Sequence, residues 1–133
     1  MLSKIVALTS LVSAAYQGEC PEVPVQENFD ANAYLGRWYT IARDKYSDFE
    51  WFGQCETATY SHQDNGDIKV VNRGWFWWAF FNYTSVTGNA NCPDNGPRCH
   101  VDFSGQASKR TGPANYNVIT TDYKTYSLVY SCS

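Results

Sequence analysis

From Gly36 onward, apolar and polar residues alternate along short segments that are divided by turn residues. In Ile68-Lys69-Val70 the lysine must face solvent, so the two aliphatic side chains point to the opposite face of a strand. Turn signals such as Asp64-Asn65-Gly66 and Thr111-Gly112-Pro113 separate the segments. The candidate strands cover residues 37–43, 56–62, 67–73, 83–90, 100–105, 116–121 and 125–132.

The candidate strands follow one another through loops that leave no room for crossover helices. Parallel neighbours need such helices, so the pattern predicts an all-β fold in which the strands form an antiparallel meander. Before the strands, residues 29–34 are predicted to make one helical turn that Asp30 caps. An extended arm over residues 16–27, which contains Pro21 and Pro24, leads into that turn.

Length and charge exclude several classes of protein. The 133 residues suit a single domain with one core. Ten Lys and Arg residues against thirteen Asp and Glu residues give a net charge of -3 without any basic run. The chain therefore lacks the electrostatic footprint of a nucleic-acid-binding protein, and we expect no nucleic-acid partner.

The first fifteen residues have the composition of a secretion signal. Lys4 forms a short positive region, residues 5–12 are apolar, and Ser13-Ala14-Ala15 are small enough for signal peptidase. The apolar stretch is too short to cross a bilayer, so we expect no transmembrane helix. The predicted organisation is a signal peptide over residues 1–15 and one secreted, extracellular domain over residues 16–133.

Five cysteines in a secreted chain of this length predict disulfide bonds, and the odd number leaves one thiol without a partner in the chain. Cys92 and Cys99 enclose a turn-rich loop, which favours a local bridge. The spacing does not decide how the other three pair; they are Cys20, Cys55 and Cys132. A zinc site from Cys92, Cys99 and His100 lacks the usual ligand spacing, so no metal or other cofactor is expected.

Two blocks of sequence occur in a characteristic order. The first joins residues 20–30 to Tyr34-Leu35-Gly36-Arg37-Trp38-Tyr39, with Gly36 and Trp38 as a Gly-x-Trp core. The second is Thr121-Asp122-Tyr123, flanked by Val118-Ile119 and residues 126–132. Together they resemble the lipocalin family, in particular its apolipoprotein D-like members.

The resemblance implies an up-and-down lipocalin calyx whose floor is crossed by Trp38. It places Gly36 with Thr121, Asp122 and Tyr123 at that closed end, where Asp122 is expected to hold a turn by hydrogen bonding. It also implies a disulfide between Cys20 and Cys132, which leaves Cys55 unpaired.

Relatives continue past the position of Ser133 with an eighth strand and a C-terminal helix, and the resemblance implies that both are missing from this sequence. We therefore expect seven strands of a shortened calyx, whose closure depends on the missing strand. With Trp38 facing inward, Tyr39 and Ile41 are expected to face outward, on the surface that the helix covers in relatives.

Alternation also selects the side chains of the barrel interior. The predicted ligand-binding residues are Ile68, Val70, Val101, Phe103, Tyr116, Val118 and Val129. Thr120 and Ser127 are expected on the same face, which makes a mostly apolar pocket with a few hydroxyls. Such a pocket suits a small hydrophobic ligand, and the resemblance implies binding and transport of a lipid, sterol, retinoid, carotenoid or bilin.

No enzyme activity is expected, since the common catalytic motifs are absent from the sequence. Two alternatives remain. One is a thiol-dependent isomerase of the lipocalin prostaglandin-synthase type that uses Cys55, and the other is an interaction protein that binds no ligand.

The run from Gly74 to Phe81 holds too many consecutive apolar residues for one face of a strand. By lipocalin topology it is a loop at the open mouth, where Trp75, Trp77 and Trp78 are suited to a membrane or lipoprotein surface. Alternatively, the strands extend further or a dimer forms. Beside the run, Asn82-Tyr83-Thr84 is an N-glycosylation sequon, which predicts a glycan on Asn82.

Overall fold

A computed structural model describes residues 19–44, 53–76, 79–104 and 112–132 of the chain. Within these ranges, seven strands form one antiparallel sheet in which every strand pairs with its neighbours in sequence. The strands are β1 (Gly36–Tyr39), β2 (Gly53–His62), β3 (Ile68–Phe76), β4 (Asn82–Asn91), β5 (Arg98–Asp102), β6 (Tyr116–Thr121) and β7 (Ser127–Ser131). The predicted all-β antiparallel meander is confirmed.

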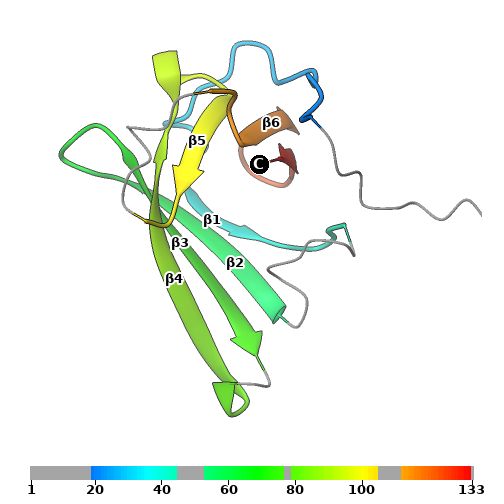
Figure 1. Ribbon diagram of the computed structural model, residues 1–133, viewed down its shortest axis with the longest axis vertical. Helices are drawn as coiled ribbons and strands as arrows, with labels where there is room; N and C mark the ends of the chain where they lie inside the picture. Colours follow the sequence, from blue (N-terminus) through cyan, green and yellow to red (C-terminus); the bar gives the residue numbers. More distant parts are fainter. Residues whose placement is uncertain (1–18, 45–52, 77–78, 105–111, 133) are drawn as a thin grey trace, which may run out of the picture.

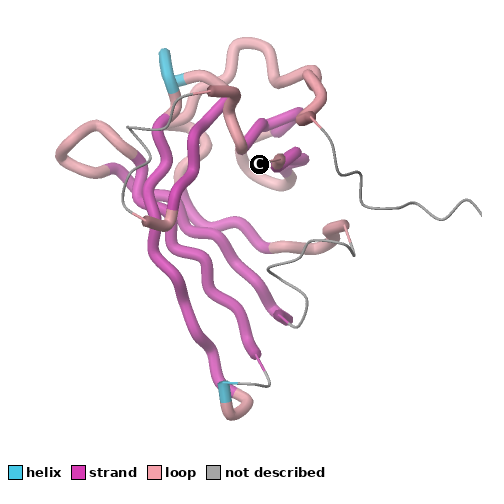
Figure 2. The backbone as a smooth tube through the Cα atoms, viewed as in Figure 1, coloured by secondary structure: helices cyan, strands magenta, loops and turns pink. Residues whose placement is uncertain are grey.

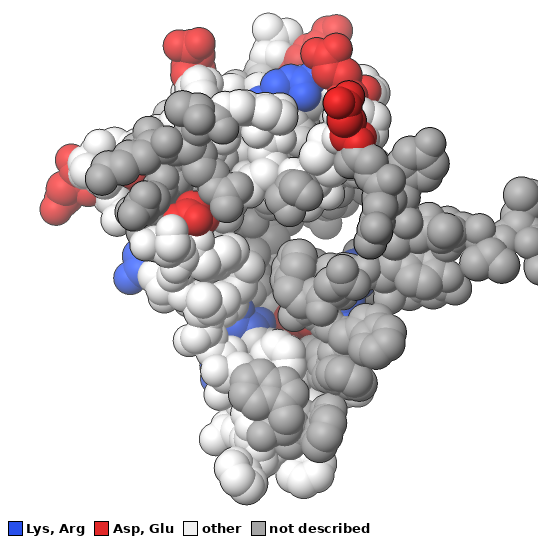
Figure 3. Space-filling view, in the orientation of Figure 1, with Lys and Arg blue, Asp and Glu red and all other residues white. Residues whose placement is uncertain are grey.

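The sheet curls into a half-barrel (Figures 1 and 2). The long strands β2, β3 and β4 extend toward the tip of the β3–β4 hairpin, while β5 to β7 curl over at the opposite end. A short 3-10 turn, η2 (Pro93–Asn95), lies between β4 and β5. Acidic side chains gather at the end with the N-terminal arm, whereas the described part of the hairpin tip carries no charge on this face (Figure 3).

Turn chemistry fixes the register of the β2–β3 hairpin. Gly66 takes φ +87°, a left-handed conformation that suits glycine. Asn65 Oδ1 accepts the Asp67 N–H at 3.0 Å, and the Gln63 N–H donates to the Asp67 carbonyl at 3.0 Å. The register that follows pairs Tyr60 with Val70 and places both side chains on the inner face of the sheet.

The N-terminal arm lies beside β5 and β6. The Gln26 N–H donates to the Val118 carbonyl at 2.9 Å, and Gln26 Oε1 accepts the Thr121 N–H at 3.0 Å. Arg98 Nη2 donates to the Val23 carbonyl at 2.8 Å. The arm thus supplies backbone partners that β6 would otherwise lack.

The predicted helical turn lies where the arm enters the sheet. The Tyr34 N–H donates to the Asp30 carbonyl at 3.2 Å, which closes one turn. Asp30 Oδ1 accepts the Asn32 N–H at 2.9 Å in the manner of an N-cap, and it also accepts Asn95 Nδ2 at 2.9 Å. Asn95 and Asn32 together lower the pKa of the Asp30 carboxyl below its usual value.

A bulge in β6 corrects one expectation about the interior. Val118 pairs with Val129, but Thr120 pairs with Leu128, so one additional residue separates them on β6. Thr120 therefore shares the outer face with Leu128, and Thr121 takes the inward position opposite Ser127. Simple alternation along the sequence could not reveal the inserted residue.

Strand ends also differ from the expected ones. β3 continues to Phe76, three residues beyond the expected end, because Gly74, Trp75 and Phe76 pair with the start of β4. Trp75 is therefore a strand residue and not part of a mouth loop, whereas Trp77 and Trp78 lie outside the described residues. β5 ends at Asp102, so Phe103 follows the strand.

Strands β1 and β7 are the two edges of the described sheet. Tyr39 is 66% exposed and Ile41 is 92% exposed, as expected for side chains that point away from the interior. In the described part of the chain, no helix combines the length and apolar character that crossing a membrane requires.

Candidate functional site

The inner face of the half-barrel is defined by rows of paired residues. One row joins Tyr60, Val70 and Gly88, and the next joins Ile68, Ala90 and Val101 across β3, β4 and β5. A further pair joins Val118 to Val129. Val70 and Val118 are the largest fully buried side chains among the described residues.

Four of the predicted ligand-binding residues meet around one small cavity; they are Ile68, Val101, Tyr116 and Val118. The cavity has a volume of about 20 Å³, and its other walls include Phe29, Tyr34 and Tyr60. A space of this size holds about one water molecule. The closed end of the half-barrel is therefore packed by the protein itself.

The other three predicted residues lie around this packed end. Val70 is buried in the adjoining row, and Val129 is half-buried opposite Val118. Phe103 is 43% exposed, and its ring lies over Gly88 on the inner face.

Aromatic rings form the floor. Trp38 stacks on Tyr34 with 4.9 Å between ring centroids, and its Nε1 donates to the Tyr34 carbonyl at 2.9 Å. Phe29 lies 5.4 Å from Tyr34 and 5.8 Å from Tyr123 between ring centroids. Residues of both sequence blocks therefore meet at one end. Gly36, at φ +117°, lets the chain turn from the helical region into β1.

Asp122 closes the β6–β7 loop. Its carboxylate accepts the backbone N–H groups of Lys124 at 3.0 Å, Thr125 at 2.8 Å and Tyr126 at 3.1 Å, and it also accepts the Thr125 hydroxyl. The hydrogen bond from the Thr125 hydroxyl and those from the backbone hold the pKa of Asp122 far below its usual value. Thr121 Oγ1 accepts the Tyr123 N–H at 3.0 Å and donates to the Tyr126 carbonyl at 2.8 Å.

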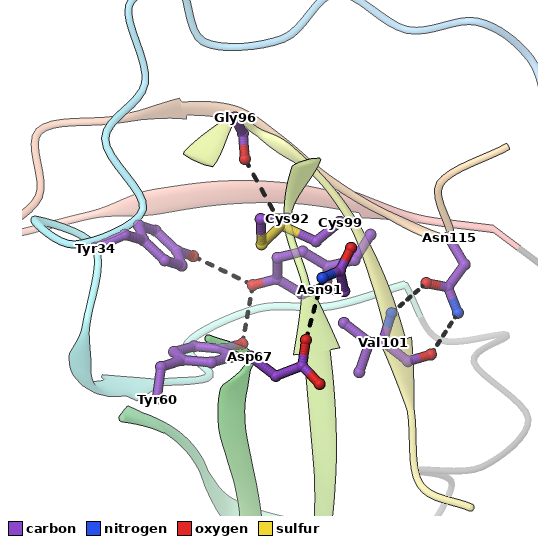
Figure 4. The surroundings of a disulfide bond; sticks show 10 residues. Tyr34, Tyr60, Asp67, Asn91, Cys92, Gly96, Cys99, Val101 and Asn115 are labelled. Atoms are coloured by element: carbon purple, nitrogen blue, oxygen red, sulfur yellow. Dashed lines mark hydrogen bonds between the residues drawn. A yellow bond between two sulfur atoms is a disulfide. The ribbon is translucent and has the colours of Figure 1, made fainter. Parts of the chain in front are cut away.

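Four hydroxyl groups form a chain behind the floor. Distances between hydroxyl oxygens are 2.9 Å from Tyr60 to Tyr116, 3.2 Å from Tyr116 to Tyr34 and 2.7 Å from Tyr34 to Ser127. Figure 4 shows Tyr34 and Tyr60 converging beside the Cys92–Cys99 disulfide. Burial raises the pKa of Tyr116 well above its usual value, and burial also raises that of Tyr34.

Sequence reasoning selected Tyr116 and Ser127 for the inner face but missed Tyr34 and Tyr60. Tyr60 carried a usable signal, because it alternates with the β-branched Thr59 and Thr57 on β2. Tyr34 lies before the strands, and only the fold brings it under them.

Next to the row of Tyr60, Val70 and Gly88, the concave face carries a second row of mostly apolar side chains. Ala58, Asn72 and Val86 pair in one row across β2, β3 and β4, on the same face as Val70. Val86 is 50% exposed although it faces the concave side. Asn72 Oδ1 is buried without a hydrogen-bond partner among the described residues. Its neighbours in the row, an alanine and a valine, have no polar side-chain atom to offer.

The cysteines form the two disulfides that join Cys20 to Cys132 and Cys92 to Cys99. Cys92 and Cys99 also line the small cavity. Cys55 is a free, exposed cysteine at the β2 bulge, with φ 52°. It lines a separate open groove of about 310 Å³ next to the ion pair between Arg43 and Glu56, whose atoms are 2.5 Å apart.

No group of three His, Cys, Asp or Glu side chains that could hold a metal ion occurs in the parts of the chain that the structure describes. Asn82 is exposed at the first position of β4.

A curled antiparallel sheet, closed at one end by stacked rings and open above them, is the architecture of small-ligand carriers of the calyx type. Residues 29–133 match the model of the lipocalin-like domain family. The chain belongs to this family, and the resemblance inferred from the sequence is confirmed.

Several named proteins are similar to this chain. Apolipoprotein D of Mus musculus is 36% identical over the whole chain, which covers 70% of that protein. Apolipoprotein D of Rattus norvegicus is 40% identical over 87% of the chain and 58% of that protein. The Lazarillo protein of Schistocerca americana is 30% identical over 96% of the chain and 58% of that protein.

The chain thus spans little more than half the length of two of these relatives. Among solved structures, the cockroach allergen Per a 4 has the same fold, with a TM-score of 0.58 and 23% identity. That comparison covers 86% of this chain and 66% of the allergen. Lipocalins related to apolipoprotein D are generally binding proteins without enzyme activity.

Proposed function

We propose that this protein is a secreted carrier that binds a small hydrophobic molecule on the concave face of its sheet. Membership of the lipocalin family supports this function. The observation that carries the proposal is the exposed apolar surface of Val86 and Phe103 above a packed aromatic floor. Apolar side chains that face a concavity and remain in water are stabilised when a hydrophobic ligand covers them.

The proposed ligand lies above the floor and not within it. The cavity among the tyrosines holds about one water molecule at about 20 Å³, which excludes a lipid or sterol there. The adjoining row on the concave face holds Ala58, Asn72 and Val86, and of these Val86 is exposed. Val70 and Phe103 border this row. In this proposal Ile68, Tyr116, Val118 and Val101 support the base of the ligand site.

The chemistry of this row favours a neutral lipophile with one polar group. Its three side chains are uncharged, so a buried ionised headgroup would lack a partner there. Asn72 supplies an amide that can bond a hydroxyl or a carbonyl. A sterol, a retinoid or a long-chain alcohol has this composition.

Two features support secretion and transport outside the cell. Residues 1–15 have the pattern of a signal peptide, and the protein contains two disulfides, which persist in oxidising compartments.

The test compares two tryptophan substitutions on adjacent residues of β4. Val86→Trp fills the concave face, whereas Ser85→Trp places the same ring on the outer face as a matched control. Binding of an anthroyloxy-labelled fatty alcohol, followed by fluorescence, should weaken by about tenfold or more in Val86→Trp and stay unchanged in Ser85→Trp. Equal affinities for both variants would contradict the proposed site.

Native mass spectrometry of the secreted wild-type protein, followed by organic extraction, identifies any ligand acquired in the cell. A monomer that releases no lipophile and does not bind the labelled alcohol would contradict the carrier function itself.

The sequence-based alternatives stay predictions. Cys55 lines the separate open groove and not the tyrosine-lined cavity, so Cys55→Ser is expected to leave ligand binding unchanged. Contact of Trp75, Trp77 and Trp78 with a membrane or lipoprotein surface stays a prediction, as does dimerisation.

A further inference from the structure

The tip of the β3–β4 hairpin exposes two phenylalanines. Phe80 is 94% exposed and Phe81 is 72% exposed. Both residues take positive φ angles, 54° and 58°. Bulky side chains are rare in this left-handed region, where Asn and Gly are the residues normally found. The Phe81 ring contacts that of Trp75, but both phenylalanine rings stay largely in water, which favours a group that covers them at the tip.

The sequon begins at the next residue. Asn82-Tyr83-Thr84 has no proline in the middle and therefore meets the requirement of the oligosaccharide-transferring enzyme. Asn82 is exposed, and its Oδ1 accepts the Tyr83 N–H at 2.8 Å, so the nitrogen end of the amide is the end left for attachment. The described part of the hairpin tip projects away from the curled end of the sheet that holds β5 to β7 (Figure 1).

We propose that Asn82 carries an N-linked glycan whose first sugars cover the rings of Phe80 and Phe81. In the transfer step, Asn82 Nδ2 forms a bond to the anomeric carbon of a lipid-linked oligosaccharide. The bond from that carbon to the lipid diphosphate breaks, and one amide proton is lost to the medium as the diphosphate leaves. The proposal requires entry into the secretory pathway and is independent of the proposed ligand.

The sugars suit the rings because one face of a pyranose presents C–H groups, which pack against the electron-rich face of an aromatic ring. The turn brings both phenylalanines within two residues of the attachment point. Trp75 braces the base of the tip. Its Nε1 donates to the Phe81 carbonyl at 3.1 Å, and the ring centroids of Trp75 and Phe81 lie 5.9 Å apart. A bulky polar glycan at Asn82 would also hold the tip away from a bilayer or a second copy.

Glycan attachment is tested by translating the full chain with endoplasmic-reticulum microsomes. The protease-protected wild-type product should be larger than the untreated chain and return to its smaller size with peptide-N-glycosidase. Asn82→Gln and the isosteric Thr84→Val should abolish the shift, and Thr84→Ser, which preserves the sequon, should retain it. A parallel chain with an established signal peptide in place of residues 1–15 ensures import. Imported, protected chain of unchanged size would overturn the proposal.

Ring coverage is tested with Phe80→Asn combined with Phe81→Gly, because asparagine and glycine tolerate the positive φ angles of these two positions. In the protein secreted from animal cells, enzymatic removal of the glycan should lower the Tm of the wild type by several degrees and leave the Tm of the double variant unchanged. An equal Tm loss in both proteins refutes ring coverage. Flotation of glycosylated wild type, but not of the double variant, with phosphatidylcholine vesicles would assign the rings to a membrane instead.

Discussion

Gly88 is the position where a single added methyl group most directly tests the geometry of the concave face. A Cβ at Gly88 would lie 2.5 Å from Phe103 Cδ1 and 2.6 Å from the Asp102 carbonyl oxygen. Carbon atoms in contact prefer about 3.5–4.0 Å, so each neighbour would have to withdraw by about 1 Å. The ring can rotate, but the carbonyl belongs to the last residue of β5 and moves only with the strand.

The cost of Gly88→Ala follows from these distances. Overpacking of this kind destabilises by about 1–3 kcal/mol, while loss of glycine's freedom in the unfolded chain offsets about 0.4–1 kcal/mol. We expect a net loss of about 1–2 kcal/mol in the free energy of unfolding. With a urea m-value of about 2 kcal/mol/M, the midpoint should fall by about 0.5–1 M.

The assay is urea unfolding followed by tryptophan fluorescence. Gly74→Ala is the matched control, because Gly74 of β3 lies on the same face of the sheet as Gly88 of β4. A Cβ at Gly74 meets only side-chain atoms, Phe76 Cε2 at 3.0 Å and Glu56 Cγ at 3.2 Å, which can move aside. Its midpoint should therefore change by less than that of Gly88→Ala. If the two variants unfold at the same urea concentration as the wild type, Phe103 does not lie over Gly88 and the concave face has another shape.

Two further predictions concern ionisable groups. Tyr116→Phe removes the hydroxyl that links Tyr34 to Tyr60 and should cost about 1–2 kcal/mol at neutral pH. Because the folded-state pKa of Tyr116 is raised above 10.0, wild-type stability should fall as the pH rises above that value; this decline should be shallower in the variant, measured by urea midpoints at alkaline pH. The pKa of Asp122 is lowered from 3.8, so its contribution is complete above that pH and is lost as the pH falls below it. Asp122→Asn should flatten the acid side of the Tm profile, and an unchanged profile would show that the loop contributes nothing to acid sensitivity.

Local pattern predicted much of this fold. The strand from Tyr116 to Thr121 has the expected bounds, because alternation and flanking turn residues both lie within its own sequence. β3 was harder to delimit, since Gly74, Trp75 and Phe76 do not alternate and their pairing with β4 extends the strand. The β6 bulge left no sequence signal, because an inserted residue changes which face Thr120 takes without changing the composition of the segment.

Local pattern likewise predicted some residues of the candidate site and missed others. Alternation placed Ile68, Val70, Val101 and Val118 on the inner face, since the direction of a strand side chain depends only on its parity in the strand. The sequence by itself thus determined an antiparallel sheet with one apolar face and an aromatic end. Only the tertiary structure decided that tyrosines from a turn and two strands fill the closed end, because side chains distant in sequence pack by their separation in space, and the curl of the sheet sets that separation.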